Sequence, residues 1–147
     1  MKNKILCLLF SVVLAVIDLF IKFYVKNYLN NKDSIKILNG FLEVIYLENR
    51  GAALGILNKN IWLLIFISLI FIMFFILMLF MKRRFNNIFL ISSAFIIGGG
   101  IGNLANRILT GYVIDYIKLC FFNPVFNFAD CCLTLGFIGL IIYSQIT

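Results

Sequence analysis

Residues 61–81 read IWLLIFISLIFIMFFILMLFM, and Ser68 is the only polar side chain among them. At 1.5 Å of rise per residue, a helix of this length spans roughly 31 Å, which matches the hydrocarbon core of a bilayer. This segment therefore predicts a transmembrane helix and makes lipid, rather than water, the solvent around much of the chain.

Three further apolar segments cover about residues 5–25, 88–108 and 127–146. The 147-residue chain is 63% hydrophobic and 13% charged, whereas soluble domains are about half apolar and a quarter charged. No internal repeat or low-complexity linker divides the sequence. We predict a mainly α membrane protein with four transmembrane helices, forming one integral-membrane domain over residues 1–147.

The composition excludes several classes of function. The chain has no histidine, which removes histidine metal sites, Ser-His and Cys-His nucleophile pairs and any imidazole acid or base. The four cysteines contain no Cys-x-x-Cys pair, which argues against a disulfide framework and a cysteine metal site. The net charge is +7 and the basic residues are scattered. This pattern favours contact with anionic membrane lipids and not with nucleic acid.

Positive charge in the short loops predicts the orientation in the membrane. Lys2 and Lys4 precede the first apolar segment, and residues 82–84 (Lys-Arg-Arg) lie between the second and third. Because short cytoplasmic loops carry an excess of Lys and Arg, we expect both termini to be cytoplasmic. The longer connections, about 26–60 and 109–126, then face outward.

Those outward connections carry strand patterns. Residues 34–38, the turn dipeptide Asn39-Gly40 and residues 41–47 predict a β-hairpin. Residues 112–117 predict a further short strand. Since both faces of the hairpin are largely apolar, we expect it to lie against the membrane surface.

Polar residues in the apolar segments gather toward the outer leaflet on this topology. Ionisable groups in lipid cost several kcal/mol unless they are paired or line a water-filled cavity, so they are candidates for function. Asp18 and Lys22 have i,i+4 spacing and are interpreted as a structural ion pair. The full set is Asp18, Lys22, Asn49, Asn103, Arg107, Asp115, Asn127 and Asp130.

Asp115 and Asp130 differ from the others because neither has a basic residue at helical spacing, and each lies in an apolar stretch. Two carboxylates brought close together cannot both ionise cheaply, so one keeps its proton. Such a pair suits amide hydrolysis: the carboxylate takes a proton from water, and the carboxylic acid protonates the developing oxyanion. A purely structural role for both stays open on spacing alone.

Five sequence blocks together resemble the bacterial lipoprotein signal peptidases (signal peptidase II), which are integral-membrane aspartyl proteases. The resemblance covers nearly the full length, and its specificity comes from the order and spacing of the blocks. They are Asp18-x-x-x-Lys22, Asn49-Arg-Gly-Ala-Ala53, Gly99-Gly-Ile-Gly-Asn103 with Arg107, Val113-Ile-Asp115, and Pro124-Val-Phe-Asn-x-Ala-Asp130.

The resemblance implies four transmembrane helices, a small extracytoplasmic β-cradle and a catalytic dyad of Asp115 and Asp130. It implies a diacylglyceryl-modified prolipoprotein substrate, cut on the amino side of the lipobox cysteine near the outer leaflet of the bacterial cytoplasmic (inner) membrane. Neither a metal nor an organic cofactor is expected, and globomycin is expected to inhibit. Residues that position the substrate or support the dyad are expected to be Asn49, Asn103, Arg107 and Asn127.

The sequence departs from the family at three positions. Leu19 stands where the family usually has glutamine, Leu54 replaces a common aromatic residue, and Asn106 replaces an aspartate. A divergent paralogue with shifted specificity is therefore one alternative. A small proton-coupled transporter is another, with Asp18 or Asp130 near mid-membrane and facing a pore. A noncatalytic assembly protein is a third.

Overall fold

The computed structural model describes residues 2–29, 34–51, 60–81 and 86–146. Four long helices and a four-stranded sheet make up these residues. The elements are α1 (Lys2–Leu29), β1 (Ile35–Ile37), the 3-10 turn η1 (Leu38–Gly40), β2 (Leu42–Asn49), α2 (Ile61–Met81), α3 (Asn87–Thr110), β3 (Val113–Leu119), β4 (Phe122–Phe126) and α4 (Phe128–Ile146). All four helices are long and apolar enough to cross a bilayer.

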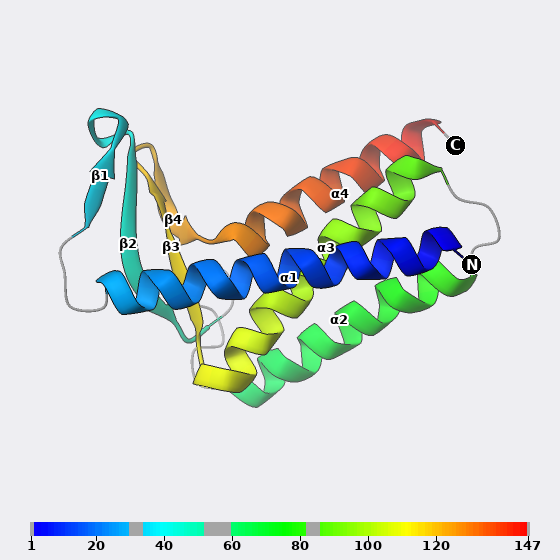
Figure 1. Cartoon of the computed structure of the whole chain (residues 1–147), viewed down its shortest axis with the longest axis horizontal. Coiled ribbons are helices and arrows are strands. Elements are labelled where there is room, and N and C mark those ends of the chain that lie inside the picture. Colours follow the sequence, from blue (N-terminus) through cyan, green and yellow to red (C-terminus); the bar gives the residue numbers. More distant parts are fainter. Residues whose placement is uncertain (1, 30–33, 52–59, 82–85, 147) are drawn as a thin grey trace.

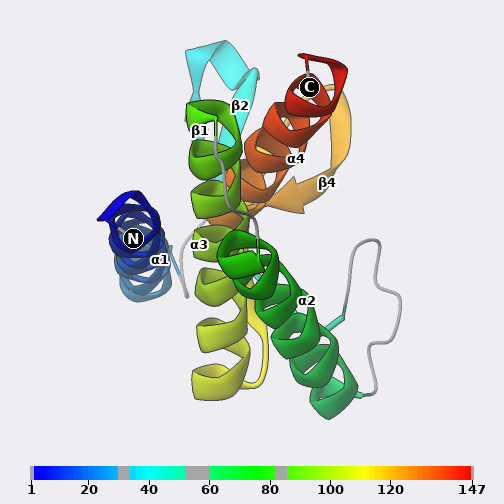
Figure 2. The same ribbon diagram turned by 90° about the vertical axis from the view of Figure 1, so that its right-hand side faces the viewer.

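Helix α3 is the centre of the bundle, with α1, α2 and α4 packed around it (Figure 2). Its glycine-rich middle lets the neighbouring backbones approach closely. From α2, Ile72 and Phe75 pack against Ile96 and Ile97 of α3 in one buried cluster. Large apolar side chains on the outer faces of the helices are exposed, as expected for surfaces that contact lipid.

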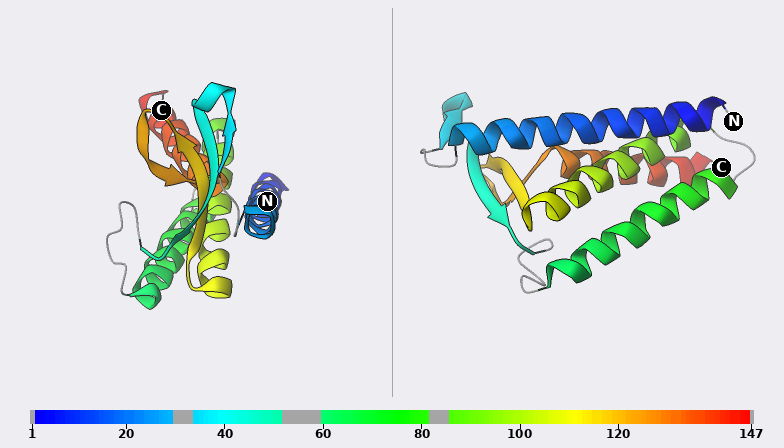
Figure 3. Two further views of the ribbon diagram at one scale, coloured as in Figure 1. Left: turned by 90° about the vertical axis from the view of Figure 1, so that its left-hand side faces the viewer. Right: turned by 60° about the horizontal axis from the view of Figure 1, so that its bottom comes forward.

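The sheet lies at the end of the bundle opposite both termini (Figure 1). Its strands are antiparallel in the order β1-β2-β3-β4. In the hairpin, Ile37 pairs with Leu42, and the turn contains Asn39 and Gly40 at φ of 55° and 88°, where glycine and asparagine are favoured. Figure 3 shows α1 and α2 diverging from the terminal end toward the sheet, with α3 between them.

The predicted fold class is confirmed, with differences at the edges. Helix α1 covers 28 residues, longer than the expected 5–25, because its apolar pattern continues past Lys22 to Leu29. Strand β4 was not predicted: Pro124 lies within it, and proline cannot donate to a strand ladder. As the last strand in the sheet order, β4 tolerates that loss. The basic residues 82–84 lie outside the described residues.

Candidate active site

Asp115 lies in β3, in the part of the sheet that abuts the helices, and its side chain is buried. Both of its carboxylate oxygens accept hydrogen bonds from side-chain amides. Asn49 Nδ2 donates to Oδ2 at 2.8 Å, and Asn127 Nδ2 donates to Oδ1 at 2.6 Å. The pKa of Asp115 is raised to about 6, mainly because the carboxyl group is buried; the neighbouring Asp130 also acts to raise it, and the two amide donors act to lower it.

Asp130 lies in the first turn of α4 and is half-buried. Asn103 Nδ2 donates to Asp130 Oδ1 at 2.8 Å, and the backbone N–H of Asn127 donates to Oδ2 at 3.1 Å. In return, the backbone N–H of Asp130 donates to Asn127 Oδ1 at 3.0 Å. This reciprocal arrangement caps the helix and places a carboxylate at its positive end.

Asn127 therefore joins the two carboxylates. It binds Asp115 through its side-chain nitrogen and Asp130 through its backbone N–H and side-chain oxygen. Residues that lie 15 apart in sequence are brought into one hydrogen-bonded cluster, and Asn127 itself is fully buried. The carboxylates are thus close enough to influence each other's charge, as an acid–base pair requires.

Asp18 and Lys22 form the predicted ion pair, with 2.7 Å between Lys22 Nζ and Asp18 Oδ2. Both side chains are about 1% exposed. The pair also reaches beyond its own helix: Lys22 Nζ donates to Asn103 Oδ1 at 2.7 Å, and Asp18 Oδ1 accepts from the backbone N–H of Ala129 at 2.9 Å. It therefore contacts both the α3 and α4 sides of the carboxylate cluster.

Asn49 and Arg107 complete the set of expected site residues. Asn49 Oδ1 accepts from the backbone N–H of Gly51 at 3.0 Å, which orients its nitrogen toward Asp115. Arg107 Nη2 donates to the Gly51 carbonyl at 3.5 Å, while its buried Nε has no hydrogen-bond partner among the described residues. Residues 52–54, including Leu54, lie outside the described residues.

Sequence reasoning missed a contribution from Asn106. Its side chain is 4% exposed, and its Oδ1 accepts from the backbone N–H of Ile114 at 2.7 Å. This bond ties β3 to α3 one residue before Asp115. Asn106, at the position where the sequence departs from the resembled family's aspartate, thus supplies an acceptor that an aspartate carboxylate would also offer.

We expect Asn106→Leu to lower the free energy of unfolding by about 1–3 kcal/mol, since it leaves a buried backbone N–H without a partner. Asn106→Asp keeps an acceptor for this N–H, so its free energy of unfolding is expected to fall less. Thermal unfolding in detergent micelles measures both. The exposed Asn123→Leu is the control, with an expected change under about 0.5 kcal/mol. Wild-type stability in Asn106→Leu would contradict this role.

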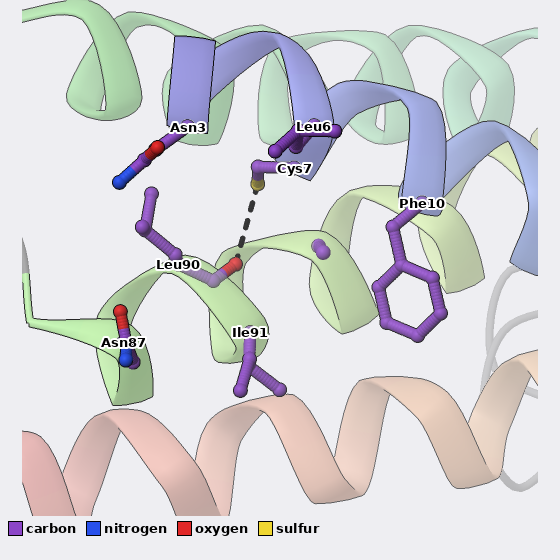
Figure 4. A pocket seen from close by; sticks show the side chains of 8 residues that line it. Asn3, Leu6, Cys7, Phe10, Asn87, Leu90 and Ile91 are labelled. Atoms are coloured by element: carbon purple, nitrogen blue, oxygen red, sulfur yellow. Dashed lines mark hydrogen bonds between the residues drawn. The ribbon is translucent and has the colours of Figure 1, made fainter.

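A separate pocket of about 320 Å³ opens between the first turns of α1 and α3 (Figure 4). There Cys7 Sγ donates to the Leu90 carbonyl at 3.2 Å. Its lining is mainly apolar, and it shares no residue with the carboxylate cluster. Among the described residues, no group of three or more Cys, Asp or Glu side chains is arranged to hold a metal ion.

Comparisons with known proteins point to one family. A family model described as Signal peptidase (SPase) II matches residues 10–146. A lipoprotein signal peptidase of Halothermothrix orenii is 38% identical over 138 residues, covering 92% of this chain and 94% of the relative. The lipoprotein signal peptidase of Lactiplantibacillus plantarum is 35% identical over 136 residues, covering 92% of this chain and 91% of the relative.

Solved structures share the fold. One, described as a bacterial membrane enzyme determined by the in meso method, has a TM-score of 0.87 at 28% identity over 95% of this chain and 87% of that chain. A second structure with the same description has a TM-score of 0.84 at 28% identity, over 93% of this chain and 90% of that chain. The arrangement of four helices and one sheet is therefore common to all three chains.

Proposed function

Because the chain belongs to the signal peptidase II family, we propose that this multi-pass bacterial membrane protein removes signal peptides from diacylglyceryl-modified prolipoproteins. It cuts on the amino side of the lipobox cysteine. The observation that carries the proposal is the cluster in which Asn127 bonds both Asp115 and Asp130. Two carboxylates held together in this way supply the acid and the base that amide hydrolysis needs without histidine.

The proposed reaction uses one ionised and one protonated carboxyl group. The ionised group takes a proton from water, whose oxygen bonds to the scissile carbonyl carbon. The protonated group gives its proton to the carbonyl oxygen, forming a gem-diol. The base then passes its proton to the amide nitrogen and a hydroxyl proton returns to the acid. The C–N bond breaks, and the new carboxyl end and the amine leave.

The surrounding polar groups fit roles in holding the substrate. We assign to Arg107, whose buried Nε has no partner among the described residues, the role of donating to a substrate carbonyl. Asn49 and Asn103 hold Asp115 and Asp130, respectively, in fixed rotamers, which favours a productive geometry. The acyl chains of the substrate stay in the lipid, where they contact the exposed apolar faces of the helices.

The site is proposed to lie near the outer leaflet, with both termini in the cytoplasm. The termini share one end of the bundle, and the sheet lies at the other (Figure 1). Asp115 belongs to strand β3 of that sheet, and Asp130 to the first turn of α4, which follows β4. Lys2 and Lys4 lie at the end of the bundle that carries the termini, and their positive charge supports a cytoplasmic location for that end. Asp18 is 13 residues beyond Ile5, roughly 20 Å along a helix, which supports a site in the outer half of the membrane.

The test is incubation of purified protein with a diacylated lipobox peptide and with its unacylated twin. We expect cleavage of the acylated peptide before the cysteine, faster than of its twin, and inhibition by globomycin. A proton-coupled transporter would leave both peptides intact and would instead carry protons into liposomes. A paralogue with shifted specificity would cut at another bond.

The rate is expected to depend on pH through Asp115. We assign the role of the acid to Asp115, whose pKa is raised to about 6, mainly by burial. Deprotonation removes that acid, and kcat/KM is expected to fall as pH rises through about 6. Glu48→Gln is the control: Glu48 is a half-buried carboxylate that pairs with Arg50, and its loss should leave this fall in rate at the same pH. A rate that rises over the same interval would assign the acid elsewhere.

A further inference from the structure

The orientation of the Asn103 amide is fixed by Lys22. A lysine ammonium only donates hydrogen bonds, so the group that Lys22 Nζ contacts at 2.7 Å must be the amide oxygen of Asn103. The NH2 group of Asn103 then faces the other way, toward Asp130 Oδ1 at 2.8 Å. An NH2 group only donates, so the Asp130 oxygen opposite it has to accept.

The Lys22 ammonium has two partners among the described residues, Asp18 and Asn103, and Asp18 is itself held in place. Asp18 binds the ammonium, and Asp18 in turn accepts from the Ala129 N–H in the first turn of α4. A Cβ on Gly102 would lie 2.6 Å from Asp18 Oδ2, so the ion pair lies directly on the α3 backbone. Because only about 1% of its side chain is exposed, Lys22 cannot exchange these partners for solvent.

The second oxygen of Asp130 also faces a donor, the backbone N–H of Asn127, at the positive end of α4. Asp115, by contrast, lies in a strand, and both its donors are neutral amides that no cation touches in the described residues. The two carboxyl groups are therefore not equivalent. Negative charge is better accommodated on Asp130.

We propose that Lys22 is a positioning residue that, through Asn103, holds Asp130 as the ionised member of the carboxyl pair. This inference rests on the proposed function and goes beyond a structural ion pair. It makes Asp130 the group that takes the proton from water and leaves Asp115 as the acid. Asp18 balances the charge of Lys22, so the influence on Asp130 comes chiefly from the fixed amide and not from a net positive charge.

Other charged groups also face Asp130. They are Asp18 and Lys22 from α1, Arg107 from α3 and Asp115 from β3. The test therefore removes the Lys22 contact while changing as little of the remaining charge as it can. Lys22→Met removes the donor, and the double variant Asp18→Asn/Lys22→Met does so without leaving a lone buried carboxylate. Lys26→Met is the matched control, since Lys26 Nζ donates to the Tyr112 hydroxyl, away from the cluster.

The kinetic readout is kcat and KM for the diacylated peptide as a function of pH. We expect Lys22→Met and the double variant to lose roughly 100-fold in kcat, with KM changed less than about threefold. We also expect the acidic side of the pH–rate profile, where the rate rises as the base ionises, to move to higher pH by about one unit. The reason is that Asn103, without Lys22, is free to turn and no longer holds its NH2 group against Asp130. Lys26→Met should keep the wild-type profile. An unmoved acidic limb in a folded Lys22→Met or double variant would overturn the proposal.

A second readout needs no cleavage and separates this inference from the proposed function. Infrared titration of protein labelled with 13C-aspartate, with Asp130→Asn or Asp115→Asn spectra subtracted, reports the ionisation of each carboxyl group. When the wild-type pair holds one proton, the carboxylate band should be the one assigned to Asp130 and the protonated carboxyl band the one assigned to Asp115; the reverse assignment would overturn the proposal even if every Lys22 variant failed to fold. Failure to cut the peptide, with Asp130 found as the ionised member, would overturn only the proposed function.

Discussion

Asp115→Asn and Asp130→Asn should each abolish cleavage, by about 10⁴-fold or more in kcat, while the protein still inserts into the membrane and folds. An amide neither takes a proton from water nor gives one to a carbonyl oxygen at neutral pH. In either variant the dyad therefore loses one of its two proton transfers, and the remaining carboxyl group cannot perform both.

The structural cost of these substitutions is modest. Asp115 accepts from two amide nitrogens, and an asparagine there keeps one acceptor but turns its NH2 group toward the other donor. One hydrogen bond is lost, at a cost of about 1–3 kcal/mol. Asp130→Asn loses one partner in the same way. Neither loss removes the apolar helix packing on which insertion depends.

The measurement pairs a cleavage assay with thermal unfolding of the same preparation. Glu43→Gln is the matched control, because Glu43 is a carboxylate in the sheet that pairs with Lys118 and lies outside the cluster. It should cut at the wild-type rate. If purified Asp115→Asn or Asp130→Asn cuts within about tenfold of wild type, the carboxyl pair is not the catalytic dyad.

The helices were predictable because lipid imposes a simple rule: a spanning segment must be apolar for about 20 residues and satisfy its own backbone. Residues 61–81 obey it so strictly that the predicted and observed ends coincide. The hairpin was predictable from Asn39-Gly40, whose backbone adopts the left-handed conformation that the turn needs. The family predicted from the spacing of polar blocks is also confirmed.

The contacts between elements were not predictable in the same way. Spacing of i,i+4 brought Asp18 and Lys22 together on one helix face, as found. Nothing in that spacing tells which neighbour the pair meets, and the bonds to Asn103 and Ala129 depend on α1 lying against Gly102. The sequence pattern of one helix predicts which of its faces is polar, whereas a site built from five elements (α1, β2, α3, β3 and α4) depends on how those elements pack together.

Gly99→Ala should disrupt both stability and catalysis, since a Cβ at residue 99 would lie 2.5 Å from the carbonyl oxygen of Ala129. That atom is backbone and cannot rotate away, so α4 has to move off α3. Overpacking of this kind costs about 1–3 kcal/mol. The shift also displaces the first turn of α4, where Ala129 binds Asp18 and Asp130 binds Asn103.

Gly136→Ala separates the two effects on the same pair of helices. Its Cβ would lie 2.5 Å from Ile96 Cγ1 and 2.8 Å from the Ser92 carbonyl oxygen, so a similar loss of stability is expected. Residue 136 is six residues, about 9 Å, along α4 from Asp130, and the first turn should stay in place. The rate per folded molecule is therefore expected to fall at least tenfold in Gly99→Ala and less than about threefold in Gly136→Ala. Equal rates in the two variants would mean that the contact between Gly99 and Ala129 does not position Asp130. Leu109→Phe, which enlarges an exposed side chain on α3, should change neither quantity, because lipid accommodates the larger ring.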